Sequence, residues 1–206
     1  MPLQNRVDPE GNIISTNARG AWLGNRGVIH NDQKQIVRPF KIKAWITCAL
    51  QFKGRHRAVM TPNRWTELFF LDEATAFAAG HRPCFECRRD YANLFKAAWI
   101  KGNPGFGFNL KTPIGKIDDI IHSERIKADR SKVIFKENPQ KLPDGTFILF
   151  ENNRYLINQH KMYLWTPFGY EAGKDLPAND KVEVLTPASI VNAFAAGYIP
   201  QMGLKV

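Results

Sequence analysis

Residues Phe69–Arg89 read FFLDEATAFAAGHRPCFECRR, and this stretch carries the strongest structural and chemical signals in the chain. Asp72 is of the residue type that accepts hydrogen bonds from the free N–H groups of a helix's first turn. Gly80 can take the left-handed conformation that closes a helix, and Pro83 stops its continuation. We therefore expect a strand end, a short helix and a rigid turn to follow one another here.

Cys84 and Cys87 form a C-x-x-C pair whose two sulfur atoms can converge on one ion. A helix expected from Arg89 to about Trp99 would offer the positive end of its dipole to the thiolates. We interpret the pair as half of a structural Zn²⁺ site, with a redox dithiol and ordinary packed thiols as the alternatives. The redox interpretation is disfavoured because a thioredoxin-like motif lies in a βαβ unit, and the sequence shows no such alternation.

A zinc ion needs two further ligands, which must come from elsewhere in the chain. Cys48 and His56 are the favoured candidates because both lie in a neighbouring segment that is predicted to be a hairpin. Cys48 falls on the apolar face of that hairpin, where a lone cysteine is more often part of the core. His81 is the alternative ligand beside the C-x-x-C pair, and His30 and His122 are more remote candidates.

Residues 41–60 alternate in polarity as a half-buried strand does, and then turn through KGRHR into AVM. The pattern predicts a β-hairpin with a basic turn. One predicted face is apolar and comprises Ile42, Ala44, Ile46, Cys48 and Leu50. The opposite predicted face comprises Lys41, Lys43, Trp45 and Thr47.

The stretch around the C-x-x-C pair resembles the second half of the zinc module in Ada-type DNA alkylphosphotriester-repair proteins. Those modules have a Phe-containing strand, an EAxAAG helix, an aromatic residue and then R-P-C-x-x-C. The matching positions here are Phe69, Phe70, Glu73, Ala74, Ala78, Ala79, Gly80, Arg82, Pro83, Cys84 and Cys87. The resemblance covers roughly 20 of 206 residues. It implies a local zinc knuckle and an association with DNA, and says little about the rest of the chain.

Two departures from that family bear on the chemistry. The family has a first cysteine pair about one hairpin upstream, which includes the methyl-accepting nucleophile, whereas residues 52–60 here read FKGRHRAVM without a cysteine. Alkyl transfer of the family's kind is therefore not expected. His81 also replaces the usual Phe or Tyr before R-P-C.

The chain is basic, with 29 Lys and Arg against 19 Asp and Glu and a net charge of +10. Residues 33–66 hold no acidic side chain but eight cations, interleaved with Phe40, Trp45, Phe52 and Trp65. Cations neutralise phosphates and aromatic rings stack on bases, so this segment favours a nucleic-acid partner. A solvated basic face that only aids solubility is the alternative. The candidate contact residues are Lys41, Lys43, Lys53, Arg55, Arg57, Arg88 and Arg89.

The Gly/Pro-rich break at Gly102–Gly107 divides the chain into residues 1–103 and 104–206, which we expect to pack as one globular unit. After the break, IGKIDDIIHSERI predicts a helix. LPDGTFILFENNRYLINQHKMYLWTP predicts a meander of about three strands, with turn signals at Asp144-Gly145 and Asn152-Asn153. The expected class is α+β, with antiparallel hairpins and short helices around the zinc knuckle, because no βαβ alternation is present.

The AFAAG helix ending occurs twice, in Phe70–Pro83 and in Leu185–Pro200. In the second copy, Thr186 is the expected N-cap and Gly197 the expected C-terminal stop. Because the second copy has no cysteine, we interpret the repeated unit as a structural device to which the cysteine pair is added in the first copy.

Two functional hypotheses follow. The favoured one is a nucleic-acid-associated protein, with DNA preferred over RNA, in which Zn²⁺ is structural. The second is a metal-dependent phosphodiester hydrolase with a site at Asp118, His122 and Glu124 in IDDIIHSER. A polar helix face is the commoner explanation of such a cluster. A third interpretation is a domain whose zinc only stabilises the fold.

The sequence also favours a cytoplasmic protein without a membrane partner. No apolar run approaches the roughly 18 residues that span a bilayer. The N-terminus MPLQNRVDPEGN is polar and acid-containing, unlike a secretory signal. Three cysteines cannot pair into a disulfide framework, which suits a reducing compartment.

Overall fold

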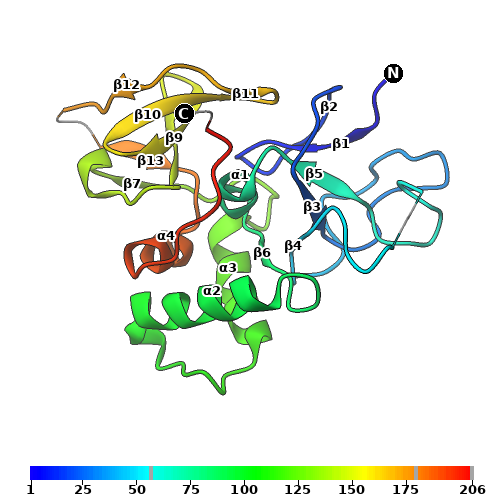
Figure 1. The fold of residues 1–206 in the computed structure, drawn as a ribbon, viewed down its shortest axis with the longest axis horizontal. Helices are drawn as coiled ribbons and strands as arrows, with labels where there is room; N and C mark the ends of the chain where they lie inside the picture. The colour runs from blue at the N-terminus through cyan, green and yellow to red at the C-terminus, as the bar shows by residue number, and fades with distance from the viewer. Residues whose placement is uncertain (56–57, 179–180, 205–206) are drawn as a thin grey trace.

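The computed structural model describes residues 1–55, 58–178 and 181–204. The predicted α+β class is confirmed: two mainly antiparallel sheets and short helices alternate along the chain without a repeated βαβ unit in these residues. Figure 1 shows the two sheets on either side of helix α1 (Glu73–Ala78), with the remaining helices grouped at one end of the molecule.

The N-terminal sheet holds six strands within the described residues, in the order β2-β1-β5-β3-β4-β6. Most neighbours are antiparallel, but β1 runs parallel to β5 and β4 runs parallel to β6. The strands are β1 (Gln4–Val7), β2 (Ile13–Ser15), β3 (Trp22–Asn25), β4 (Ile46–Cys48), β5 (Leu68–Phe70) and β6 (Arg82–Pro83).

The C-terminal sheet has the order β11-β10-β9-β8-β13-β7, and β12 pairs with β10. Its strands are β7 (Phe135–Glu137), β8 (Phe147–Phe150), β9 (Asn153–Asn158), β10 (Lys161–Thr166), β11 (Gly169–Tyr170), β12 (Lys174–Asp175) and β13 (Val182–Val184). The predicted three-strand meander is β8, β9 and β10. Both of its turns, at Glu151-Asn152 and Gln159-His160, have positive φ at two central residues, as tight hairpins require. Asp144-Gly145 precedes β8 and joins no two strands of the meander.

Helix α1 separates the two sheets because its side chains are small. Ala74 and Ala78 pack against the C-terminal sheet, while Ala76 and Ala79 pack against the N-terminal sheet. Asp72 caps the helix as predicted, since its Oδ1 accepts from the Thr75 N–H at 2.8 Å. The alanine-rich segment therefore places α1 in contact with both hydrophobic layers.

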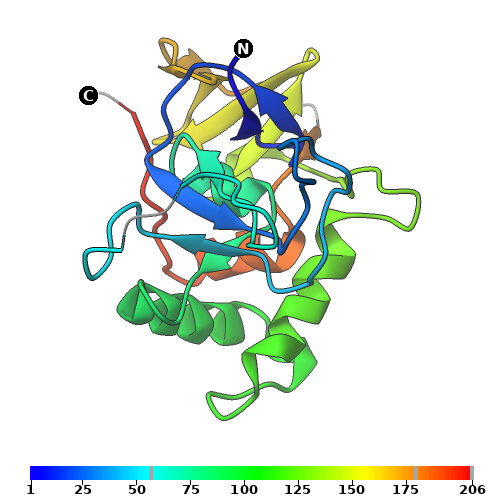
Figure 2. The same cartoon turned by 90° about the vertical axis from the view of Figure 1, so that its right-hand side faces the viewer.

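The other helices are α2 (Arg89–Gly102), α3 (Ile114–Arg125) and α4 (Ala188–Ala195), with 3₁₀ turns η1 (Pro104–Phe106) and η2 (Pro139–Lys141). Figure 2 shows α2 and α3 together as the two green helices at the lower end of the molecule. α2 packs closely on α4, because a Cβ at Gly102 would lie 2.2 Å from the Asn192 carbonyl oxygen. The break at Gly102–Gly107 therefore lies between helices that share one core. No helix among the described residues has both the length and the apolar composition that a membrane crossing demands.

Both AFAAG copies end their helices in the same way. The φ angles of Gly80 and Gly197 are 82° and 112°, and the next residue donates its N–H five positions back along the chain. Thr186 does not cap α4, which corrects the prediction: its hydroxyl accepts from the Phe147 N–H of the neighbouring sheet. Glu124 supplies the acceptor for the Ser189 N–H instead.

The hairpin predicted for residues 41–60 is wrong. Within 41–55 and 58–60, β4 is the only strand, and it pairs with β3 and β6. The predicted faces are also wrong in part: Trp45 is 3% exposed and Thr47 fully buried, whereas Ile42 is 41% exposed. Ile46 and Cys48 are half-buried and line a cavity.

Candidate metal centre

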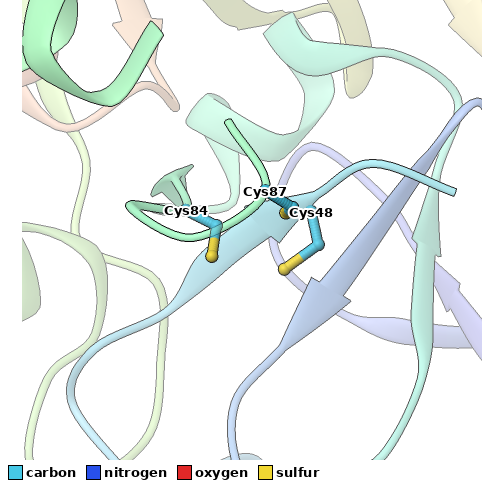
Figure 3. Close-up of side chains that lie close together, drawn as sticks. All are labelled: Cys48, Cys84 and Cys87. Atoms are coloured by element: carbon cyan, nitrogen blue, oxygen red, sulfur yellow. The ribbon is translucent and has the colours of Figure 1, made fainter. Parts of the chain in front are cut away.

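Three sulfur atoms converge at one end of the N-terminal sheet. The Sγ atoms of Cys48, Cys84 and Cys87 all lie within 4.8 Å of one another, and Figure 3 shows them projecting toward a common point from β4 and from the turn after β6. In the described part of the chain, this is the one group of three or more His, Cys, Asp or Glu side chains with such spacing. The predicted pair Cys84 and Cys87 is thus joined by Cys48.

The pairing of β4 with β6 brings the cysteines together. Thr47 lies opposite Pro83 in parallel register, and the Cys84 N–H donates to the Thr47 carbonyl oxygen at 2.9 Å. The next residue on each strand is a cysteine. The Arg88 N–H then donates to the Cys84 carbonyl oxygen at 3.0 Å, which closes the turn and brings Cys87 back toward the other two.

The local backbone favours thiolates. The Glu86 N–H donates to Cys84 Sγ at 3.3 Å, and the turn leads directly into α2, whose N-terminal end carries a partial positive charge. Hydrogen bonds from Cys48 and Cys87 hold the pKa of the Cys84 thiol below its usual value. The pKa of Cys48 is raised, because its S–H donates to Cys84 and its site is buried.

The donor set fits a zinc ion. Thiolates are soft ligands that Zn²⁺ and iron–sulfur clusters prefer, and Zn–S bonds of about 2.3 Å bring sulfurs to within about 4 Å of one another. The spacing of the three Sγ atoms is compatible with this geometry. Three protein ligands leave one tetrahedral position for a further donor.

A cavity of about 240 Å³ adjoins the cysteines. Its walls are mainly apolar and aromatic, with Phe52, Trp65 and Phe69 among them. The polar residues Asn25 and Glu67 also line it, and Glu67 is buried, with Oε2 accepting from the Met60 N–H at 2.8 Å. The cavity therefore offers space for a fourth ligand beside the three sulfur atoms.

His56 and Arg57 lie outside the described residues. Arg55 and Val59, which flank this gap, line the cavity beside the cysteines. The assignment of His56 as a ligand stays a prediction.

His81 is not near the cysteines, so its assignment as the alternative ligand is wrong. Its Nε2 accepts from Arg26 Nε at 3.2 Å, and its ring packs on Phe70 and Trp45. Burial, followed by the charges of Arg26 and Arg125, lowers the pKa of His81 well below its usual value. His30 is also committed elsewhere, since its Nδ1 is 2.6 Å from Thr66 Oγ1.

Asp118, His122 and Glu124 share helix α3 but do not form one site. Both carboxylate oxygens of Asp118 accept from the buried Arg82, at 2.7 and 2.8 Å. His122 Nδ1 lies 2.7 Å from Arg125 Nη2. Glu124 Oε2 accepts from the Ser189 N–H at 3.0 Å and from its hydroxyl. Asp118 ties α3 to β6 and Glu124 ties it to the start of α4, whereas His122 contacts Arg125 of the same helix. The three side chains therefore have separate structural partners.

Arg88 does not belong to an exposed basic surface, which corrects the sequence-based assignment. It is 5% exposed, and its Nη2 pairs with Glu73 Oε1 at 2.7 Å. Its guanidinium also stacks on Trp22, with 3.9 Å between its carbon and the ring centroid. Together with the pair of Arg82 and Asp118, this contact anchors the C-x-x-C turn from both sides.

The other described candidates for nucleic-acid contacts are exposed. Lys41, Lys53 and Arg89 present their side chains to solvent. Lys43 pairs with Asp119 at 2.9 Å and Arg55 pairs with Glu86 at 2.7 Å, both on the surface. Two of the exposed cations near β4 are therefore already paired with acidic side chains.

No protein-family model matches the chain, and neither a curated protein nor a solved structure matches it. The resemblance to the Ada-type zinc module accordingly stays a prediction that rests on the motif itself.

Proposed function

We propose that this protein binds Zn²⁺ through Cys48, Cys84 and Cys87, that the ion is structural, and that the protein associates with nucleic acid. The observation that carries the proposal is the convergence of three thiols from two separate segments. Three sulfur ligands and no described carboxylate or imidazole among them favour Zn²⁺ over harder divalent cations.

The backbone pairing that brings the cysteines together is short. β4 has three residues and β6 has two, so their pairing buries few backbone hydrogen bonds. The bound ion would join β4 to the start of α2 and so close the intervening chain into a loop. Because such a site does not exist in the unfolded chain, the free energy of metal binding adds to the free energy of folding.

The identity of the fourth ligand decides whether the zinc site is closed or open. A fourth protein ligand, for which His56 is the candidate, makes a closed structural site. Water in the adjoining cavity makes an open one. A structural role predicts that His56→Ala lowers zinc affinity and thermal stability, whereas an open site predicts no change in either.

Exposed cations support the nucleic-acid part of the proposal. Lys53 follows Phe52 at the wall of the cavity, and Arg89 follows the cysteine turn at the start of α2. Tyr91 is 54% exposed beside Arg89 and can stack on a base. With a net charge of +10, binding is expected to be driven by counterion release.

The metal is tested by elemental analysis of protein purified without a tag or chelator. We expect one zinc per chain, and its loss in Cys48→Ser, Cys84→Ser and Cys87→Ser. A full complement of zinc in Cys48→Ser would refute the three-cysteine site.

Nucleic-acid binding is tested by fluorescence anisotropy with a labelled DNA duplex and an RNA of the same sequence at several salt concentrations. The double variant Lys53→Gln/Arg89→Gln should lower the slope of log affinity against log salt by about 2. Lys161→Gln/Lys174→Gln, which changes two exposed lysines of the C-terminal sheet, is the matched control. Absence of DNA binding at low salt would refute this part and leave the metal site untouched.

A further inference from the structure

Among the described residues, four arginines are almost fully buried, and they fall into two kinds. Arg82 and Arg88 each pair with a carboxylate, at 2.7 Å in both cases. Arg26 and Arg125 are 1% and 3% exposed, and in the described part of the chain neither forms an ion pair. A buried charge without a counter-charge is strongly unfavourable, so the second kind needs an explanation.

The partners of Arg26 are all neutral. Its Nε donates to His81 Nε2 at 3.2 Å and its Nη1 donates to the Gly11 carbonyl oxygen at 3.0 Å. Its Nη2 is buried without a hydrogen-bond partner. Its guanidinium carbon lies 3.9 Å from the centroid of the Trp45 ring. These contacts hold the side chain in place but do not compensate its charge.

Arg125 is held in the same manner. It donates to the carbonyl oxygens of Gly80 and Lys43, each at 2.7 Å, and its Nε has no partner. It stacks on Trp45 at 3.8 Å. Gly80 makes room for it, because a Cβ there would lie 2.3 Å from Arg125 Cδ. Two guanidinium groups are thus brought to one indole ring without a carboxylate between them.

Both arginines line a cavity of about 460 Å³. Lys132 lines it too, with its ammonium group donating to the Ala78 carbonyl oxygen. The exposed side chains of Arg38 and Arg130 complete the cationic lining. The one acid in the wall, Glu10, is paired with Arg154, and the nearby carboxylate of Asp8 accepts from Asn12. Five cations therefore surround a space whose only lining carboxylate is already engaged.

Burial lowers the pKa values of two of these cations. Burial lowers the pKa of Arg26 to about 9, with only the charge of Asp8 opposing it. Burial, followed by the charge of Arg26, lowers the pKa of Lys132 to about 7. A bound anion would reverse both effects.

We propose that this cavity binds a phosphate group, presented by a small phosphate ester or by the terminal phosphate of a nucleic acid. A dianion matches a cluster of guanidinium and ammonium groups, and buried guanidinium N–H groups form strong charge-assisted bonds with phosphate oxygens. Asn12, Ser131 and Gln4 add neutral polar groups to the wall. The cavity has room for an organic group beside the phosphate.

The site is separate from the metal centre. Side chains of a strand alternate between its two faces. Ile46 and Cys48 line the cavity of the metal centre, whereas Trp45 lines the cationic cavity. The inference therefore does not rest on zinc or on the proposed nucleic-acid surface.

The first test is the binding of inorganic phosphate and phenyl phosphate to the zinc-loaded protein, by calorimetry and by thermal shift at constant ionic strength. Wild-type protein should bind and be stabilised. Arg38→Gln/Arg130→Gln, which changes only exposed side chains, should lose about tenfold or more in affinity. Arg19→Gln, an exposed arginine outside the cavity, is the matched control and should bind as wild type does. No response to either phosphate, or an equal loss in Arg19→Gln, would overturn the proposal.

A second variant separates a binding role from a structural one. Lys132→Met should keep or raise the melting temperature of the ligand-free protein, because it removes a buried unpaired charge, and should abolish stabilisation by phosphate. A lower melting temperature together with an unchanged phosphate response would overturn the proposal.

The source of the phosphate is resolved with a 5′-phosphorylated oligonucleotide and its 5′-hydroxyl counterpart. Tighter binding of the phosphorylated strand that disappears in Arg38→Gln/Arg130→Gln assigns the cavity to a nucleic-acid end. Equal binding of the two strands, with the phenyl phosphate response retained, assigns it to a small ester.

Discussion

Two groups of side chains with opposite electrostatic character lie on the two sides of the chain at β4. On one side, Cys48 lies beside two other thiols, and the three can bind a cation when they lose their protons. On the other side, Trp45, the residue before β4, lies against Arg26 and Arg125, whose charges have no carboxylate partner among the described residues. The first group suits a cation, and the second suits an anion.

The charge of a buried arginine can be compensated by a carboxylate of the fold or by a bound ligand. Arg82 and Arg88 flank the cysteine turn in the sequence, and each has a carboxylate from a neighbouring helix. The fold is therefore able to pair a buried arginine where the charge serves only structure. Arg26 and Arg125 were left unpaired in the same neighbourhood, which is the pattern expected of a binding site.

The largest expected effect is loss of the metal. Cys84→Ser should lower the free energy of unfolding by about 3 kcal/mol or more, because metal binding is coupled to folding. Urea denaturation with zinc analysis measures both quantities. A chelator should bring wild-type protein to the stability of the variant and leave the variant unchanged; equal stability of wild type with and without metal would contradict a structural ion.

The buried pair of Arg82 and Asp118 comes next. Asp118→Asn should cost about 3–5 kcal/mol, because it leaves the guanidinium without its counter-charge. Lys43→Gln, which removes the exposed pair with Asp119, should cost less than about 1 kcal/mol. If Asp118→Asn lowers stability no more than the control does, a carboxylate partner is not what stabilises a buried arginine in this fold. The contrast between the paired Arg82 and the unpaired Arg26 would then lose its meaning.

Glu124→Gln should have a smaller effect. Its carboxylate caps the start of α4 through Ser189, and loss of such a cap costs about 1–2 kcal/mol. Thermal unfolding measures the change. Loss of phosphodiester turnover without loss of stability would instead support the hydrolase hypothesis.

The smallest effect concerns pH. The pKa of Lys132 in the folded protein is about 7, below its ordinary value of 10.5, and the charged groups that face it are Arg26, Arg125, Asp8 and Glu10. The unfolded chain therefore binds more protons above pH 7, and stability should rise as the pH is raised from about 7 to 8.5. Urea denaturation of zinc-loaded protein in phosphate-free buffer measures the slope. Lys132→Met should flatten it, and Lys161→Met, on an exposed lysine, should not.

Local signals in the sequence predicted much of the fold. Asp72 and Gly80 bound α1 because capping depends on neighbours a few residues away. The meander followed from alternation between turns. Thr186 is the exception: its hydroxyl was taken by the Phe147 N–H, a partner 39 residues away.

The candidate site was predicted in part. Cys84 and Cys87 follow from a spacing of three residues. Cys48 does lie beside them, but not for the reason given in the sequence analysis. The predicted hairpin would have placed it through a turn, whereas a parallel pairing of β4 with β6 places it beside Cys84. His81 was misplaced because proximity in sequence does not reveal which face of a sheet a side chain takes.

The features that could be predicted from the chain alone are local ones: the α+β class, the ends of α1 and the cysteine pair. Each depends on interactions within about one helical turn or one strand. The tertiary structure decided which distant charges meet. Arg26 and Arg125 are 99 positions apart in the chain, and they come together only because β3, β4 and the end of α3 pack around Trp45. Burial and charge pairing depend on contacts across the whole fold, and no spacing of residues along the chain encodes them directly.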